Sequence, residues 1–125
     1  MAPAWLRQRF DELLLEGEIL TCAVVKLELL HHEEAPGSFR DRRSDLDALD
    51  SAPIDERVCS RALEVQGELA AGGGARHRGI KLPDYLIAAA AEVAGLTLLH
   101  YDSDYELLAG ATGQPHDWIA PRGSL

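Results

Sequence analysis

The sequence predicts an α/β domain with a short, mainly parallel sheet. Segments with helical spacing of apolar residues alternate along the chain with short extended runs. This alternation is typical of helices that cover a parallel sheet. The 125 residues, of which 46% are hydrophobic, suit one domain with its own core. We therefore expect a single domain over residues 1–125, without an internal repeat.

The N-terminal part of the chain is predicted to fold as helix, strand and helix. A first helix begins near Pro3 and ends at Gly17; its apolar residues recur at helical spacing and are Trp5, Leu6, Phe10, Leu13 and Leu14. A short strand is predicted over residues 19–21. Strand and helix signals compete over residues 23–32, and the length of this run favours a helix.

Two further helices are predicted in the middle of the chain. Ser38 is expected to cap the first of them, whose apolar positions include Phe39 and Leu46. After a brief extended segment at 52–54, Asp55 is expected to cap a helix over 56–71 with an inward stripe formed by Val58, Ala62, Val65 and Leu69. Three consecutive glycines then end this helix and begin a mobile loop that extends through Gly79.

Acidic residues lie at both ends of a helix and strand unit near the C-terminus. The predicted elements there are a helix at 84–94, a strand at 96–100, a helix at 104–111 and an extended piece at 118–119. Asp84 begins the first helix and Asp102 follows the strand. Ligand sites of open α/β sheets lie beyond the carboxyl ends of the strands. Carboxylates gathered there would bind a hard divalent cation such as Mg²⁺ or Mn²⁺.

Each acid also has a purely structural interpretation. Asp84 suits the positive end of a helix dipole. Glu28 interrupts an apolar run and points either to solvent or into a polar cleft. Asp104 is the expected cap of the last helix, which leaves Asp102 without that role. The five histidines lack the spacing of a zinc site, and we assign none of them a catalytic role.

Charge and cysteine content narrow the possible functions. The formal net charge of −9 argues against binding nucleic acid through the whole surface. Arg76, Arg78 and Lys81 still form a local basic cluster, which is either a site for RNA phosphates or a solvated loop. Cys22 and Cys59 are expected to be buried, reduced thiols. The N-terminus resembles no signal peptide and no long apolar run is present, so a cytoplasmic protein is expected.

Taken together, these segments resemble PIN-domain proteins of the VapC toxin type. The resemblance covers nearly the whole chain and rests on the order and spacing of four segments. These are the Glu28-bearing stretch 21–28, His77-Arg78 with 83–89, the stretch 98–105 that contains Asp102, and Gly113-Gln114 through Trp118. It implies a PIN-like three-layer fold in which helices flank the short sheet.

The resemblance also implies an activity and a site. Proteins of this type are Mg²⁺- or Mn²⁺-dependent endoribonucleases, usually toxins that a cognate antitoxin neutralises, and commonly dimers. The acid cluster of the family corresponds to Glu28, Asp84 and Asp102, with Asp104 as a further candidate. Asp84 and Asp102 are the expected metal ligands, and Glu28 either binds the metal or positions the attacking water. Asp104 is expected to support these ligands without binding the metal directly.

The sequence departs from the family at its N-terminus. PIN domains of this type begin with a central strand that ends in an aspartate, whereas this chain starts at what resembles the first helix. We expect the strand and its acid to be missing and the metal affinity to be reduced. Two alternatives therefore accompany the ribonuclease reading. One is a catalytically silent PIN protein that acts by antitoxin binding or self-association. The other is an unrelated α/β interaction domain whose acids are caps and surface charges.

Overall fold

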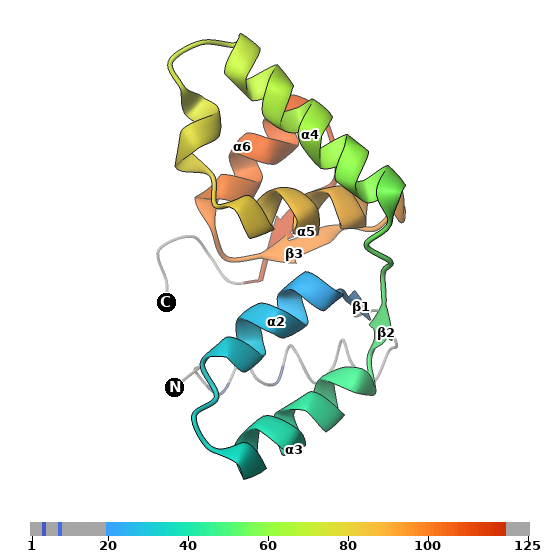
Figure 1. Cartoon of the computed structure of the whole chain (residues 1–125). Coiled ribbons are helices and arrows are strands. Elements are labelled where there is room, and N and C mark those ends of the chain that lie inside the picture. The colour runs from blue at the N-terminus through green and yellow to red at the C-terminus, as the bar shows by residue number, and fades with distance from the viewer. Residues whose placement is uncertain (1–3, 5–7, 9–19, 120–125) are drawn as a thin grey trace.

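The computed structural model describes residues 4, 8 and 20–119. The elements follow in the order β1 (Leu20–Thr21), α2 (Ala23–His31), α3 (Pro36–Asp47), β2 (Asp50–Ser51), α4 (Glu56–Ala71), the 3₁₀ helix η1 (Arg76–Gly79), α5 (Leu82–Val93), β3 (Leu98–His100), α6 (Ser103–Thr112) and β4 (His116–Trp118). In Figure 1, α4, α5 and α6 gather around β3, while α2 and α3 lie beside β1 and β2. The predicted helix between Pro3 and Gly17 lies outside the described residues. The α/β class is confirmed.

The strands pair in parallel, as predicted, and within residues 20–119 they form two separate ladders. Thr21 of β1 pairs with Ser51 of β2, and Leu98 of β3 pairs with His116 of β4. A cavity of about 580 Å³ is lined by residues of both β1 and β3, together with apolar side chains of α2 and α5. Within residues 20–119, the two pairs of strands therefore border a shared, largely apolar cavity and do not join in one sheet.

Several boundaries differ by a few residues from the sequence prediction, two of them in the middle of the chain. Helix α3 begins at Pro36, because proline suits the first helical position, and Ser38 therefore lies inside the helix and does not cap it. The Ser38 hydroxyl donates a hydrogen bond to the Ala35 carbonyl at 3.1 Å. The sequence predicts an extended segment at 52–54, whereas strand β2 lies just before it, at Asp50–Ser51.

The segment after α4 is more ordered than the predicted mobile loop. It contains η1, which follows Ala75 in the left-handed conformation with φ of 53°. The Tyr85 hydroxyl of α5 donates a hydrogen bond to the His77 carbonyl at 2.8 Å. This contact attaches η1, which carries Arg76 and Arg78, to the beginning of α5.

The core lies among α4, α5, α6 and β3. The predicted inward stripe of α4 is confirmed, since its four residues are all buried. Leu108 of α6 and Val58 of α4 are the largest side chains that are fully buried among the described residues. Small side chains at Ala88, Ala89 and Ala90 allow close packing on α5. The core thus fixes α5 and α6 relative to each other, and these helices carry the acidic residues.

The two cysteines have different environments. Cys22 is buried, as expected, whereas Cys59 is exposed, and neither forms a disulfide. Cys59 follows the inward residue Val58 by one position, which on a helix turns its side chain about 100° away from the core. The prediction for Cys59 was therefore wrong. None of the helices in the described part of the chain is long and apolar enough to cross a membrane.

The cap of α4 allows a direct test of the fold. The Asp55 side chain accepts a hydrogen bond from the Val58 backbone N–H at 3.1 Å, as the sequence predicts. We expect Asp55→Ala to lower the free energy of unfolding by about 1 kcal/mol, because one N–H at the helix start loses its partner. Urea unfolding measures the change. Asp55→Asn is the matched control, since asparagine caps equally well, and an equal loss in both variants would contradict the capping role.

Candidate metal centre

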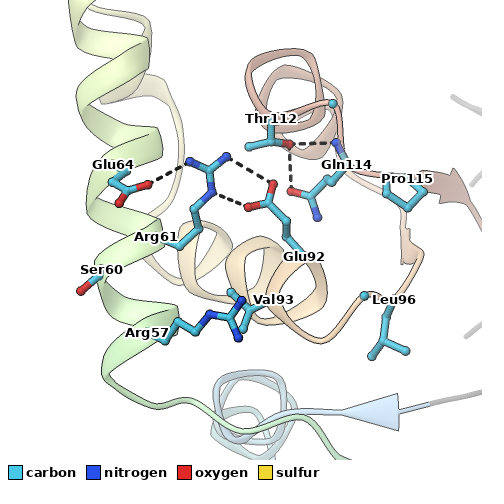
Figure 2. Close-up of a pocket in the computed structure, with 12 residues that line it drawn as sticks. Arg57, Ser60, Arg61, Glu64, Glu92, Val93, Leu96, Thr112, Gln114 and Pro115 are labelled. Carbon is cyan, nitrogen blue, oxygen red and sulfur yellow. Dashed lines mark hydrogen bonds and ion pairs between the residues drawn. The ribbon is translucent and has the colours of Figure 1, made fainter.

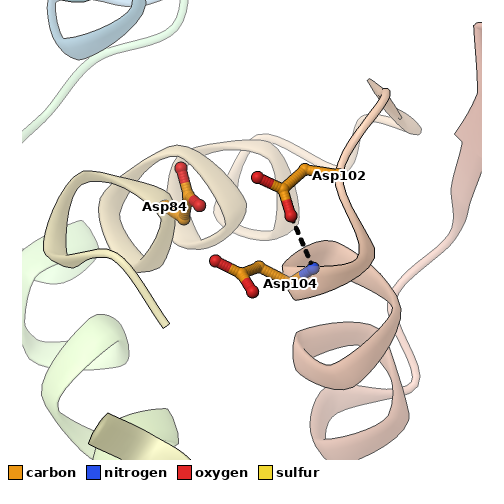
Figure 3. Close-up of side chains that lie close together, drawn as sticks. All are labelled: Asp84, Asp102 and Asp104. Atoms are coloured by element: carbon orange, nitrogen blue, oxygen red, sulfur yellow. Dashed lines mark hydrogen bonds between the residues drawn. The ribbon is translucent and has the colours of Figure 1, made fainter. Parts of the chain in front are cut away.

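Three acidic residues from two segments of the chain converge beside the N-termini of two helices. Asp84 lies in the first turn of α5, Asp102 precedes α6 and Asp104 lies in its first turn. Each residue offers a carboxylate oxygen, and these oxygens lie within 4.8 Å of one another. Figure 3 shows the three carboxyl groups pointing toward a shared space. The structure thus brings together three of the four predicted acids.

Asp84 is the most buried of the three acids, with only 4% of its surface exposed. Its Oδ1 accepts a hydrogen bond from the Tyr105 hydroxyl at 2.9 Å. Its Oδ2 is buried and has no hydrogen-bond partner among the described residues. The pKa of Asp84 is raised to about 6, chiefly by burial and then by Asp104 and Asp102, while the Tyr105 hydrogen bond opposes the shift.

A divalent cation fits this set of donors. Carboxylate oxygens are the ligands that hard cations prefer, and three of them can be reached from one point. A buried carboxylate oxygen without a partner is costly in water-poor surroundings, and a cation beside Asp84 Oδ2 would remove that cost. The repulsion among the acids would become attraction to the ion.

Asp102 caps α6 and also lies near a lysine. It can cap the helix because α6 begins at Ser103, one residue earlier than predicted. Its Oδ1 accepts a hydrogen bond from the Asp104 backbone N–H at 2.9 Å, so Asp102 caps the helix and the predicted cap at Asp104 was wrong. Its Oδ2 lies 3.6 Å from the ammonium nitrogen of Lys81. The cap orients the Asp102 carboxyl group and leaves Oδ2 facing the positive charge.

Glu28 lies apart from this group. It is exposed on α2 and does not belong to the set of three close acids. Its charge nevertheless helps to raise the pKa of Tyr105, after burial and the interactions with Asp84. The sequence allowed Glu28 to point either to solvent or into a polar cleft, and the structure shows it exposed to solvent. A role for Glu28 at the metal or the attacking water stays a prediction.

The predicted basic residues differ in their contacts with the acids. Arg76 and Arg78 are exposed on η1 and form no ion pair within residues 20–119. Lys81 ends this stretch; its backbone N–H donates to Asp104 Oδ2 at 3.4 Å, and its side chain pairs with Asp102. Only Lys81 therefore contacts the acidic cluster directly.

A histidine pair supports the start of α6, and sequence reasoning did not find it. His100 Nε2 lies 2.9 Å from His116 Nδ1, and the Asp102 backbone N–H donates to His100 Nδ1 at 3.3 Å. Because Nδ1 accepts, the proton of a neutral His100 sits on Nε2 and is donated to His116. Burial, followed by His116, lowers the pKa of His100. The pair forms through the β3 and β4 ladder, which the spacing of the histidines does not reveal.

A separate cavity of about 800 Å³ lies at the opposite end of α5 (Figure 2). The Arg61 guanidinium of α4 donates hydrogen bonds to Glu92 of α5 and to Glu64. Gln114 contacts Thr112 there and donates to the Ala88 carbonyl at 3.0 Å. These charged and amide groups already bind one another, so they join α4, α5 and the end of α6.

Comparison with known proteins assigns the family. The PIN domain model matches residues 3–111 of the chain. The chain belongs to the PIN domain family. The predicted resemblance to the VapC type is also confirmed. This PIN domain is 39% identical over 118 residues to "Ribonuclease VapC18" of Mycobacterium tuberculosis (strain ATCC 25618 / H37Rv), an alignment that covers 94% of this chain and 86% of the relative.

Two further relatives carry the same kind of name. "Ribonuclease VapC51" of the same strain is 36% identical over 120 residues, which cover 96% of this PIN domain and 85% of the relative. "Ribonuclease VapC2" of Mycobacterium tuberculosis (strain CDC 1551 / Oshkosh) is 44% identical over 81 residues, or 65% of this chain and 56% of the relative. The similarity to the first two extends through the segments that carry the acids.

Proposed function

We propose that this PIN domain is a metal-dependent endoribonuclease and the toxin of a type II toxin–antitoxin pair. The observation that carries the proposal is the convergence of Asp84, Asp102 and Asp104, with Asp84 Oδ2 buried and without a hydrogen-bond partner among residues 20–119. The ribonuclease names of the relatives support the same activity. The proposed partners are RNA, a cognate antitoxin protein and a second copy of the chain, and the proposed compartment is the cytoplasm.

The acidic residues would have different roles in binding the cation and in the reaction. Asp84 and Asp102 would hold Mg²⁺ or Mn²⁺ through carboxylate oxygens, and Asp104 would add negative charge from the first turn of α6. A bound cation supplies an acidified water and stabilises negative charge on the phosphate. Glu28, exposed on α2 and outside the set of three close acids, is the candidate to orient the attacking water.

The basic residues would position the RNA. Arg76 and Arg78 are exposed on η1 and free to contact phosphate oxygens. Lys81 neutralises Asp102 in the metal-free protein. With a cation held by the acids, the Lys81 ammonium group would be available to the phosphate backbone, since the Asp102 carboxylate would then have a second positive partner. Such contacts position RNA without reading its sequence.

Cleavage of a structured RNA tests the proposal. The folded wild-type chain is expected to cut the RNA with Mg²⁺ or Mn²⁺, and EDTA is expected to stop the reaction. Asp84→Asn is expected to reduce the rate by more than about 100-fold. Mutation of residues that only hydrogen-bond to metal ligands already lowers metal affinity or activity by about 10–100-fold. Asp45→Asn, on the exposed face of α3, is the matched control and is expected to retain full activity.

Two other results would be decisive. Cutting that persists in EDTA or in Asp84→Asn would exclude the acidic cluster as the source of activity. A folded protein, checked by circular dichroism, that cuts no RNA with either metal would favour the silent PIN protein that acts through antitoxin binding or self-association.

A further inference from the structure

The Tyr105 side chain is placed to control the geometry of the acidic cluster. Tyr105 lies in the first turn of α6, directly after Asp104, and its ring is buried with 8% exposure. Its hydroxyl reaches across to α5 and donates to Asp84 Oδ1 at 2.9 Å. The His100 ring packs against it, with ring centroids 5.1 Å apart. The Tyr105 side chain is therefore held in place by α6, which carries it, and by the His100 ring of β3.

The hydrogen bond distinguishes the two oxygens of Asp84. A carboxyl group can rotate about its last bond, and such terminal torsions are broad unless a contact restricts them. With Oδ1 held by Tyr105, Oδ2 is the oxygen left for a ligand, and it is buried without a partner among the described residues.

We propose that Tyr105 is a positioning residue that fixes the Asp84 carboxyl group so that Oδ2 faces Asp102 and Asp104 for a divalent cation. The proposal rests on the function proposed above. It adds that Tyr105 acts through Asp84 and touches neither the metal nor the RNA. Residues that orient metal ligands in this way commonly change metal affinity 10–100-fold.

Titration of the full chain with MnCl₂ by isothermal calorimetry tests the proposal. Tyr105→Phe removes only the hydroxyl oxygen, and we expect it to weaken Mn²⁺ binding by about tenfold. In RNA cleavage, the Mn²⁺ concentration for half-maximal rate is expected to rise by about the same factor. The rate at saturating Mn²⁺ is expected to return to the wild-type value, because the cation itself then orders the carboxyl group.

Tyr85→Phe is the matched control. Tyr85 is also a buried tyrosine and is adjacent to Asp84, but its hydroxyl donates to the His77 carbonyl and not to an acid. Each variant loses one side-chain hydrogen bond, so both are expected to lose thermal stability, whereas only Tyr105→Phe is expected to lose Mn²⁺ affinity. Wild-type affinity in Tyr105→Phe, or an equal loss in both variants, would overturn the positioning role.

Failure of this inference is separable from failure of the proposed function. If the wild type and Asp84→Asn bind Mn²⁺ equally, the metal site is wrong and the inference falls with it. If Asp84→Asn loses binding while Tyr105→Phe does not, only the inference is wrong. Should Tyr105→Phe fold poorly, NMR of the wild type gives the answer. A slowly exchanging Tyr105 hydroxyl proton that persists through a Mg²⁺ titration supports the inference, and its loss on metal addition overturns it.

Discussion

Asp84→Asn is expected to stabilise the metal-free protein by ~2–3 kcal/mol at neutral pH. The pKa of Asp84 rises from an ordinary 3.8 to about 6 in the folded state, chiefly through burial. Each pKa unit corresponds to about 1.4 kcal/mol, which is the cost of keeping this carboxylate ionised in the fold. Asparagine keeps an oxygen for the Tyr105 hydroxyl and turns an amide donor toward Asp102 and Asp104.

The pH dependence has a definite sign. The folded state binds the Asp84 proton more tightly than the unfolded state does. The stability that Asp84 contributes is therefore complete below pH 3.8 and is lost as the pH rises through about 6. The difference in free energy of unfolding between Asp84→Asn and wild type should grow over this range and stay constant above it. Urea unfolding at a series of pH values, in EDTA, measures it.

Asp45→Asn serves as the control for loss of one negative charge, because Asp45 is exposed on α3. Its difference from wild type should stay small throughout the pH series. If Asp84→Asn proves less stable than wild type at neutral pH, the carboxylate is not destabilising and the account of the cluster is wrong.

Magnesium should reverse the order of stability in the same comparison. A ligand that binds only the folded state stabilises it by about 4.1 kcal/mol at 1,000 times its Kd, which exceeds the ~2–3 kcal/mol by which Asp84→Asn is more stable without metal. The wild type is expected to gain this stabilisation, whereas Asp84→Asn, which lacks a ligand oxygen of full charge, should gain much less. A variant that is more stable without metal and less active with it would identify the acids as a site that is strained until an ion binds.

Leu108→Ala is expected to lower the free energy of unfolding by about 2–5 kcal/mol, because a fully buried leucine leaves a cavity when it is truncated. Leu108 has 1% of its surface exposed and belongs to the core beneath α6. Since most small domains are stable by only about 5–15 kcal/mol, this loss is a large share of the total. Chemical denaturation followed by circular dichroism measures it.

Leu63→Ala makes the same chemical change at an exposed position. Leu63 lies on α4 with 68% of its surface exposed, so its truncation should change stability by no more than about 0.5 kcal/mol. Equal effects at the two leucines would mean that α6 does not pack as described. The position of Asp102 and Asp104 relative to Asp84 would then also be in doubt.

The sequence predicts the local features of this fold well. The inward stripe of α4 and its Asp55 cap follow from spacing and from one cap residue, and both are confirmed. The meeting of Asp84 with Asp102 follows from the rule that ligand sites lie beyond strand ends in α/β sheets. These predictions succeed because each depends on a few neighbouring residues or on the general topology of the class.

Other features depend on contacts between distant segments. The bond from Tyr105 to Asp84 and the pair of His100 with His116 require the relative placement of α5, α6 and the two C-terminal strands. Helix starts are also uncertain by a residue in sequence-based work, which explains the exchange of roles between Asp102 and Asp104. Tyr105 was visible as an aromatic residue beside two acids, but the direction of its hydroxyl was not.

The division of the described strands into two ladders has a consequence for how the molecule opens. The Ala52 amide is bonded to the Thr21 carbonyl in one ladder, and the Ile119 amide to the His100 carbonyl beside the other. Since no ladder hydrogen bond within residues 20–119 connects the two pairs, either can break its bonds while the other keeps them. Amide hydrogen exchange should therefore report two opening free energies, and ions bound beside β3 should protect chiefly the second.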